Sequence, residues 1–434
     1  MPRELNSRDA NFAADFENFL GSKRAVEADV DVVVAEIVER VRREGDAALL
    51  DFTRRLDGLD IAPSRLRVTA DEVAAACNAC ESQAVAALEL AAARIDAHHR
   101  RQLPEDEFYE DESGVGLGAR WTAIQSAGLY VPGGTAAYPS SVLMNAVPAR
   151  VAGVPRLVMV VPAPQGRLNP LVLAAAHIAG VTEIYRVGGA QAVAALAYGT
   201  ETIAPVDKIV GPGNAYVAAA KRRVFGQVGI DMVAGPSEIL VVADGDNDPS
   251  WVAADLLSQA EHDRLAQSIL ITDDPRFARA VIKAVEGDLR TLPRAEIARA
   301  SWQDFGAVIT VQNLDEAPAL VDRLSPEHVE LAVADPESLA RRISNAGAIF
   351  LGRYTPEAIG DYVGGTNHVL PTSRAARFSS GLGVLDFMKR TSWLRCDAES
   401  LRAIGPAAVT LARAEGLDAH ARSVVIRLNI PDRD

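Results

Sequence analysis

Gln259 and His262 lie three residues apart in the segment LLSQAEHD, a spacing that suits a metal ion. On a helix, two residues at this spacing project from the same face. An imidazole is a good ligand for a borderline metal such as zinc, whereas glutamine is an uncommon one. On these two residues alone, the polar end of a surface helix is the simpler explanation.

Glu327 and His328 are consecutive in LSPEHVEL and directly precede a predicted strand. A carboxylate beside an imidazole provides two proton acceptors of different strength, which suits a substrate that must lose protons in two separate steps. Taken by itself, the dipeptide is explained more simply by a turn that holds an incidental histidine.

Two further polar segments follow. Asp361 and His368 share the Gly-rich loop AIGDYVGGTNHVLPT, and polar loops on a rigid scaffold often carry binding residues. Glu415 and His420 lie in AEGLDAH, on a predicted helix and its end, where surface decoration is the alternative. Together with the residues above, these segments indicate a metal-assisted enzyme that has a Glu/His pair for proton transfer.

Two series of alternating strands and helices must position these residues. From about Ala127, short β-branched runs such as RLVMVV alternate with Ala-rich helical runs, and a second series begins with SEILVVAD. This alternation predicts parallel sheets covered on both faces. We therefore expect an α/β fold with two Rossmann-like units and a break near Gly235 and Pro236.

The junctions of the predicted strands are rich in glycine and proline, in YVPGG, VGGAQ, VGPGN and AGPSE. In open α/β sheets, ligands lie outside the carboxyl ends of the strands, so we expect the chemistry at this edge. Backbone N–H groups beside a helix start suit anionic or dinucleotide ligands. The G-x-G-x-x-G fingerprint is absent, since SGVGLGA has the wrong spacing and no crossover unit behind it.

The predicted domain boundaries follow from these changes of texture. Residues up to about 120 have helical periodicity, and the last residues include a strand-like run, SVVIRLN. We expect four parts: a helical arm over 1–28, a first α/β domain over 29–126 plus 237–382, a second over 127–236, and a helical segment over 383–434.

Composition limits the classes of function. The 434 residues carry 44 basic and 58 acidic side chains, a formal net charge of −14. This balance disfavours nucleic acid and anionic membranes as partners. The first residues have no apolar core behind a basic head, and no apolar run is long enough to span a bilayer. We expect a cytoplasmic protein.

Eight motifs occur in an order and at intervals that resemble the histidinol dehydrogenase family over nearly the whole chain: GLYVPGGTAAYPSSVLMNAVPARVAGV, VGGAQAVAALAYGT, KIVGPGNAYVAAAK, DMVAGPSEILVVAD, DLLSQAEHD, SPEHVEL, GDYVGGTNHVLPT and AEGLDAH. The resemblance implies two successive NAD⁺-dependent oxidations at one site, from L-histidinol through L-histidinaldehyde to L-histidine. It also implies an intertwined homodimer with one Zn²⁺ per active site, and Rossmann-like domains without the Gly-rich fingerprint.

The resemblance assigns roles by matching motifs. Gln259, His262 and Asp361 resemble zinc ligands of one subunit, and His420 resembles the ligand given by the partner subunit. Glu327 and His328 match the catalytic pair. The first α/β domain would then carry the metal and the catalytic residues.

The remaining matched positions concern the cofactor and the substrate. Tyr130, Gln191 and Asn214 match positions that hold NAD⁺, in the second α/β domain. Ser237 and Glu415 match substrate-binding positions, and the resemblance extends substrate contacts to His328 and to the four zinc ligands. His368 matches a site histidine to which we assign no specific role.

Three alternatives differ in class. A related dehydrogenase could act on another polar alcohol, such as a sulfonated diol, but Glu415 favours a substrate with an amine. A zinc hydrolase with Glu327 as its base would leave Tyr130, Gln191 and Asn214 without a role. A silent binding protein is disfavoured because every matched chemical position is filled.

Overall fold

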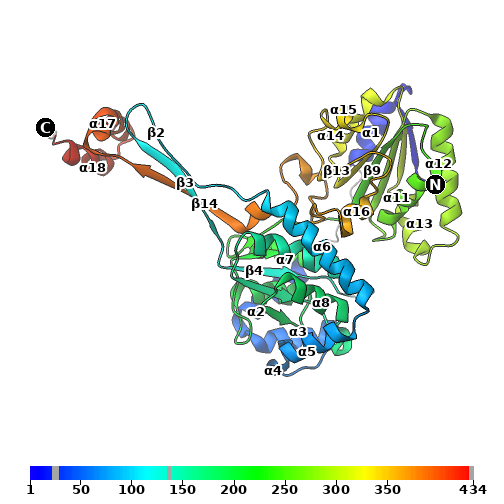
Figure 1. The fold of residues 1–434 in the computed structure, drawn as a ribbon, viewed down its shortest axis with the longest axis horizontal. Helices are drawn as coiled ribbons and strands as arrows, with labels where there is room; N and C mark the ends of the chain where they lie inside the picture. The colour runs from blue at the N-terminus through cyan, green and yellow to red at the C-terminus, as the bar shows by residue number, and fades with distance from the viewer. Residues whose placement is uncertain (22–28, 134–137, 234, 430–434) are drawn as a thin grey trace. The chain divides into compact units, whose positions relative to one another are not determined.

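The computed structural model describes residues 1–21, 29–133, 138–233 and 235–429, and the statements below concern these residues. Parts of the predicted arm over 1–28, of the loop after YVPG, and of the motif AGPSE lie outside them. The chain forms two compact units, Met1–Gln102 with Gln125–Phe387, and Leu103–Ile124 with Met388–Asp434. Figure 1 shows the elements of each unit.

The first sheet has five parallel strands in the order β6-β5-β4-β7-β8. Counted along the chain, this order is third, second, first, fourth, fifth, which is the Rossmann order without its sixth strand. The strands are β4 (Ser126–Tyr130), β5 (Arg156–Val160), β6 (Glu183–Tyr185), β7 (Lys208–Val210) and β8 (Gly229–Ile230). The helices that alternate with them are α7 (Pro139–Val151), α8 (Pro170–Ala179), α9 (Gly189–Tyr198) and α10 (Ala215–Val224).

The helices before this sheet pack against it, which corrects one predicted boundary. The apolar face of α2 (Asp29–Glu44), including Val34 and Val41, shares a core with Val193 of α9 and Val217 of α10. The helices that follow α2 along the chain are α3 (Asp46–Asp57), α4 (Pro63–Leu66), α5 (Ala70–Ala79) and α6 (Ser82–Arg100); α5 packs against α8, and α6 against α7. We expected residues 29–126 to belong with 237–382; the packing of α2 and α3 instead joins them to the sheet of β4 (Figure 1).

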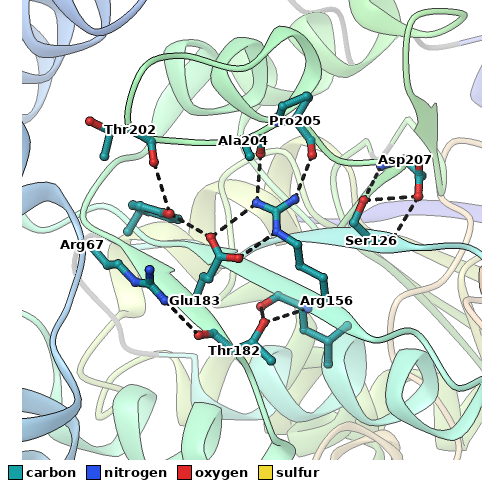
Figure 2. A network of polar contacts seen from close by, with 11 residues as sticks. Arg67, Ser126, Arg156, Thr182, Glu183, Thr202, Ala204, Pro205 and Asp207 are labelled. Carbon is teal, nitrogen blue, oxygen red and sulfur yellow. Dashed lines mark hydrogen bonds and ion pairs between the residues drawn. The ribbon is translucent and has the colours of Figure 1, made fainter.

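A polar network closes the amino ends of this sheet (Figure 2). The Arg156 guanidinium bonds Glu183 Oε1 at 2.7 Å and donates to the carbonyls of Ala204 at 3.0 Å and Pro205 at 2.8 Å. Asp207 accepts from the backbone N–H of Ser126 at 2.9 Å. These contacts link β4, β5 and β6 to the loop before β7.

The second sheet has six parallel strands in the order β1-β11-β10-β9-β12-β13. Apart from β1 at its edge, this is the strand order of the first sheet. The strands are β1 (Arg3–Asn6), β9 (Glu238–Ala243), β10 (Gln267–Thr272), β11 (Ala307–Thr310), β12 (His328–Ala332) and β13 (Ala348–Leu351).

Helices cover both faces of the second sheet. Ile239 and Val241 of β9 pack on one face with α11 (Pro249–Ala260), α12 (Pro275–Asp288) and α13 (Ala295–Asp304). Leu240 and Val242 face the other way, toward α1 (Phe12–Gly21), α14 (Ala317–Leu324) and α15 (Pro336–Ala340). The helix α16 (Glu357–Tyr362) follows β13.

The predicted helical arm over 1–28 is partly wrong. Residues 3–6 form β1, which pairs with β11, and only α1 is helical among the described residues of the arm. Phe16 and Phe19 of α1 are buried in the core with Leu240, because this amphipathic helix covers an apolar face of the second sheet. These residues therefore belong to the domain of the second sheet rather than to a separate arm.

The second unit combines an antiparallel sheet with a helical pair. The sheet has the order β14-β3-β2, with β2 (Glu107–Glu110), β3 (Gly116–Ala123) and β14 (Met388–Arg395). The helices are α17 (Ala398–Ala414) and α18 (Asp418–Leu428), and short 3₁₀ turns elsewhere are η1 (Pro164–Gly166), η2 (Leu314–Glu316), η3 (Ala375–Arg377) and η4 (Val384–Phe387).

Two predictions for this unit are wrong. The expectation of helices up to about residue 120 and again directly beyond Gly383 is contradicted by β2, β3 and β14, which pair as β14-β3-β2. The run SVVIRLN was expected as a strand but forms the end of α18, since Ala421 and Val425 lie one turn apart and pack against Val409 of α17. Among the described residues, no helix has the length and apolarity needed to cross a bilayer.

Candidate active site

The candidate site lies at the amino edge of the second sheet. Glu238 is the first residue of β9, and His328 is the first residue of the neighbouring β12. The motif AGPSE leads into β9, so it is not the strand-to-helix junction that we expected. The prediction of a carboxyl-edge site is therefore wrong for this sheet, while the prediction that Glu327 and His328 sit at the start of a strand is confirmed.

The His328 ring is buried and oriented by the backbone. Its Nδ1 lies 2.9 Å from the Glu238 carbonyl oxygen, which can only accept, so Nδ1 carries the proton. In the neutral ring, Nε2 is then the unprotonated nitrogen. Nε2 has no hydrogen-bond partner among the described residues and lies 3.9 Å from Asp361 Oδ1. The geometry thus presents a lone pair on Nε2 that can take a proton or bind a cation.

Glu327 is held by the neighbouring strand. Its Oε2 accepts from the backbone N–H of Glu238 at 3.0 Å, and Glu238 Oε2 accepts from the Glu327 N–H at 3.3 Å. Burial raises the pKa of Glu327 to about 8, against the opposing effect of His328. A carboxyl group with a pKa near the working pH suits reversible proton transfer.

Gln259 lies in the last turn of α11 and is 1% exposed. Its amide fits its neighbours when the nitrogen donates to Glu357 Oε1 at 2.7 Å and the oxygen accepts from the Glu238 N–H at 3.2 Å. The helix ends at Ala260, so His262 lies just beyond it, where its N–H donates to the Gln259 carbonyl at 3.1 Å. The two residues share one helix end rather than one helix face.

Asp361 and Glu357 lie one turn apart on α16. With His328, they place a carboxylate oxygen or ring nitrogen each within 4.8 Å of one another. Imidazole nitrogen and carboxylate oxygen are ligands that zinc accepts, and the unpartnered Nε2 of His328 points to the same group. Desolvation lowers the pKa of His262 while the Asp361 charge opposes it, so these two side chains are within electrostatic reach.

The remaining groups around this cluster are mostly acidic. Burial raises the pKa of Glu330 and Glu357 well above the ordinary value, and it raises the pKa of Asp255 to about 6. The His368 Nδ1 donates to the Asp361 carbonyl at 3.0 Å, and burial lowers the pKa of its ring. These buried acids create a site that favours a bound cation.

Four acidic residues of this region were not predicted from the sequence: Glu238, Asp255, Glu330 and Glu357. Glu357 contacts Gln259, Glu238 contacts both Glu327 and His328, and Glu330 accepts from the Glu357 N–H at 2.5 Å. The i,i+4 spacing of Glu357 and Asp361 was a usable signal for two carboxylates on one side of a helix. Glu238 and Glu330 belong to strands β9 and β12, where no comparable spacing marks them as site residues.

The three residues matched to a cofactor lie at the carboxyl edge of the first sheet, as expected. Tyr130 ends β4, is buried, and its hydroxyl accepts from the Gly189 N–H at 3.0 Å. Gln191 lies in the first turn of α9, where its Nε2 is 3.4 Å from Asp57 Oδ2 and its Oε1 has no described partner. Asn214 caps α10, because its Oδ1 accepts from the N–H groups of Tyr216 and Val217.

The other matched residues lie elsewhere. Ser237 is half-buried directly before Glu238, and its carbonyl accepts from the Gln267 N–H at 3.0 Å. Glu415 is the C-cap of α17, and His420 lies in the first turn of α18; both are exposed residues of the second unit. The structure therefore brings together Gln259, Glu327, His328 and Asp361, with His262 and His368 beside them.

Sequence comparison finds one family over nearly the whole chain. A family model described as "Histidinol dehydrogenase" matches residues 21–428. A protein named histidinol dehydrogenase from Rhizobium meliloti (strain 1021) is 66% identical over 430 residues, which cover 99% of this chain and 99% of the relative. One of the same name from Brucella abortus (strain 2308) is also 66% identical, over 99% of this chain and 100% of its own length.

Structural comparison agrees with the sequence. A crystal structure of histidinol dehydrogenase from Elizabethkingia anophelis superposes with a TM-score of 0.94 at 35% identity, over 99% of this chain and 98% of the other. The match includes both parallel sheets and the smaller unit, because nearly every residue of each chain is aligned.

Proposed function

The chain belongs to the histidinol dehydrogenase family and is an oxidoreductase, and on that premise we propose that it oxidises L-histidinol through L-histidinaldehyde to L-histidine. Two NAD⁺ would be reduced in succession at one site. The observation that carries this proposal is the buried His328, whose Nε2 is free to accept a proton beside a cluster of metal-type ligands. His328 lies next to Glu327, so the site holds two proton acceptors for a reaction with two oxidation steps.

We propose that Zn²⁺ is held by Gln259, His262 and Asp361 of one chain and by His420 of a second copy. The clustering of Gln259 and Asp361 around Glu357 and His328 supports the first part of this set. As a Lewis acid, the metal would bind and orient the amino alcohol. The exposure of Glu415 and His420 is consistent with their donation to a partner's site, where Glu415 would pair with the substrate's ammonium group.

In the first oxidation, His328 Nε2 removes the hydroxyl proton of histidinol. The carbon–hydrogen bond breaks at the same carbon, and its electron pair leaves as hydride. NAD⁺ supplies the hydride acceptor in both oxidations. The Glu238 carbonyl accepts a hydrogen bond from Nδ1, the other nitrogen of the His328 ring, so the ring keeps its orientation as it becomes charged.

In the second oxidation, the deprotonated Glu327 takes a proton from water as the oxygen adds to the aldehyde carbon. His328 returns the proton from the first oxidation to the aldehyde oxygen, which completes the gem-diol and makes Nε2 a base again. The gem-diol then loses a hydroxyl proton to His328, and the second hydride departs to leave the carboxylic acid. Burial of Glu327 supports this role, since its raised pKa makes the carboxylate a stronger base than an exposed one. Ser237, directly before Glu238, is proposed to contact the substrate.

The cofactor is proposed to lie on the first sheet. Tyr130, Gln191 and Asn214 gather at the carboxyl edge, where the N-termini of α9 and α10 favour the negative pyrophosphate. The first sheet would thus bind NAD⁺, and the second would carry the metal and the proton acceptors. We further propose a cytoplasmic homodimer, with neither nucleic acid nor membrane as a partner.

One assay tests the reaction. The purified protein, loaded with zinc, should form two NADH for each histidine when histidinol is the only added substrate. A sulfonated diol in place of histidinol should give no NADH. NADH formation with the diol alone, or hydrolysis of esters without NADH, would contradict the proposal.

A second experiment tests the shared site. His420→Ala and His262→Ala chains should each be inactive, and mixed heterodimers should regain part of the activity, because one of the two hybrid sites has all its ligands. Heterodimers that form but stay inactive would show that each site is built from a single chain.

A further inference from the structure

A buried ion pair joins Lys221 of α10 to Asp231, the residue that follows β8. Their side chains are 2% and 1% exposed, so both charges are removed from solvent. Neither residue takes part in the chemistry proposed above. Removing two charges from water is costly, and apolar residues of similar volume often stabilise a fold as well or better. The pair therefore calls for an explanation other than stability.

The pair holds both backbone polar groups of one glycine. Asp231 Oδ2 accepts from the Gly211 N–H at 2.8 Å, while Lys221 Nζ donates to the Gly211 carbonyl at 3.0 Å. Asp231 Oδ1 also accepts from the Met232 N–H at 2.6 Å. The end of β7 is thereby fixed from two sides, by a helix and by the adjacent strand, and apolar side chains could not make these directed bonds.

Gly211 is pressed against the neighbouring strand. Its φ is +114°, and a Cβ at this position would lie 2.2 Å from the Tyr130 carbonyl oxygen. Strands β4 and β7 are the pair at which the strand order reverses, which is where dinucleotides bind in open sheets. The Lys221–Asp231 ion pair, by holding Gly211, thus sets the separation between Tyr130 at the end of β4 and the loop from Gly211 to Asn214.

The loop from Gly211 to Asn214 is short, so the position of Gly211 determines the position of Asn214. Only Pro212 and Gly213 separate Gly211 from Asn214, whose side chain caps α10, the helix that also carries Lys221. We propose that Lys221 and Asp231 are positioning residues for the cofactor, which hold the Gly211–Asn214 loop in the conformation that receives NAD⁺. This inference rests on the proposed function of the first sheet.

The test replaces the pair with neutral residues of similar shape, Lys221→Met with Asp231→Asn. Asparagine keeps an acceptor for the Gly211 N–H, and no unpaired charge is left buried. We expect the Kd for NADH, measured by fluorescence titration, and the KM for NAD⁺ to rise about tenfold, since small misplacements of binding groups cost this much or more. The kcat at saturating NAD⁺ and the KM for histidinol should change by less than about twofold.

A matched control lies at the opposite edge of the same sheet (Figure 2). The variant Arg156→Met with Glu183→Gln removes another ion pair that ties strands together, at 2.7 Å. It should lower the melting temperature without changing the Kd for NADH. If the first double variant also loses only melting temperature, with the Kd unchanged, the positioning role is wrong. If it does not fold, Asp231→Glu, which keeps both charges but shifts the carboxylate that accepts from the Gly211 N–H, provides the same comparison.

The outcomes separate this inference from the proposed function. A wild-type protein that binds NADH but does not oxidise histidinol would refute the reaction, while the titrations would still decide the role of the pair. A fully active wild type with an unaltered Kd in the double variant would refute the pair's role alone.

Discussion

The two parallel sheets have the same strand order, yet their candidate sites lie at opposite edges. In the first sheet, Tyr130 and Asn214 lie at the carboxyl edge, beside the N-termini of α9 and α10. In the second, Glu238 and His328 lie at the amino edge, where α11 and α14 end. Helix N-termini favour anions and C-termini favour cations. Under the proposed function, the charge of the ligand, rather than the strand order, determines which edge binds it.

The side chains at the two edges agree with this difference. The three residues matched to the cofactor are uncharged, whereas the cluster around His328 includes Glu327, Glu357 and Asp361. An acidic edge would repel a pyrophosphate but stabilise a metal ion and an imidazolium. The two edges should therefore respond separately to chemical and genetic changes.

Removal of the metal should give the largest difference between the two edges, in histidinol oxidation against NADH binding. After treatment with a chelator, histidinol oxidation should fall by about 1,000-fold, because a bound metal contributes several kcal/mol to such reactions. Zinc added back should restore it. The Kd for NADH should stay the same in both states, as measured by fluorescence. Loss of NADH binding on chelation would mean that the two edges form one site.

The variant His328→Asn should lower the rate of oxidation almost as strongly, without affecting the cofactor site of the first sheet. We expect kcat to fall by about 100-fold to 1,000-fold, the usual contribution of a general base. The KM for NAD⁺ should be unaltered. His177→Asn is the control, since this exposed histidine of α8 belongs to the first sheet. A variant that oxidises histidinol at the wild-type rate would exclude His328 as the base.

The variant Asn214→Ala should weaken cofactor binding at the first sheet by a smaller factor and leave the metal site of the second sheet unchanged. The Kd for NADH should rise about tenfold, and the loss of the cap should lower the free energy of unfolding by about 1 kcal/mol. The zinc content should remain that of the wild type. Asn169→Ala, which removes the corresponding cap of α8, is the control and should change stability without changing the Kd. Equal Kd values in both variants would contradict a cofactor role for Asn214.

The smallest effect concerns an ion pair between α5 and the first sheet. The Arg186 guanidinium, 2.5 Å from Glu72, lowers the pKa of Glu72 to about 2 from an ordinary 4.5. A lowered pKa in the folded state stabilises the fold above pH 4.5, and this stabilisation is lost as the pH falls toward 2. Because Glu72 is partly exposed, we expect Glu72→Gln to cost about 0.5 kcal/mol at pH 7.

Urea denaturation at several pH values measures this effect. The difference between Glu72→Gln and the wild type should shrink below pH 4.5. Exposed Glu81 provides the control variant Glu81→Gln, which should match the wild type throughout. Neither variant should alter kcat. A difference that is independent of pH would show that the ion pair is not its cause.

The fold class could be predicted because buried parallel strands have continuous apolar runs, as in EILVVA and SILIT. The sequence does not predict which sheet each helix covers or which strand each strand pairs with. The periodicity of α2 shows that it has an apolar face, but not which of two sheets that face covers. β3 pairs with β14 some 270 residues later in the chain, and no local pattern in the exposed strand β14 identifies its partner.

The candidate site was predicted unevenly for a similar reason. Glu327, His328 and Asp361 were found through motifs, and the structure places them together. Glu357 was missed because a glutamate on a short helix is usually exposed, and only the tertiary structure reveals that it is 2% exposed. The edge was predicted wrongly because the rule for open sheets places ligands at the carboxyl ends of the strands. This cluster, which suits a cation, lies instead beside the C-terminal ends of α11 and α14.

The place of β1 in the second sheet sets an order of events during translation. Among the described strands, Arg3–Asn6 pairs only with β11, so it leaves the ribosome about 300 residues before its partner. At roughly 5 to 20 residues per second, it waits for about 15 seconds or more with its backbone unpaired. A strand of four residues with exposed Arg3 and Glu4 is a poor template for aggregation. Its brevity and charge protect the nascent chain until the sheet can be completed.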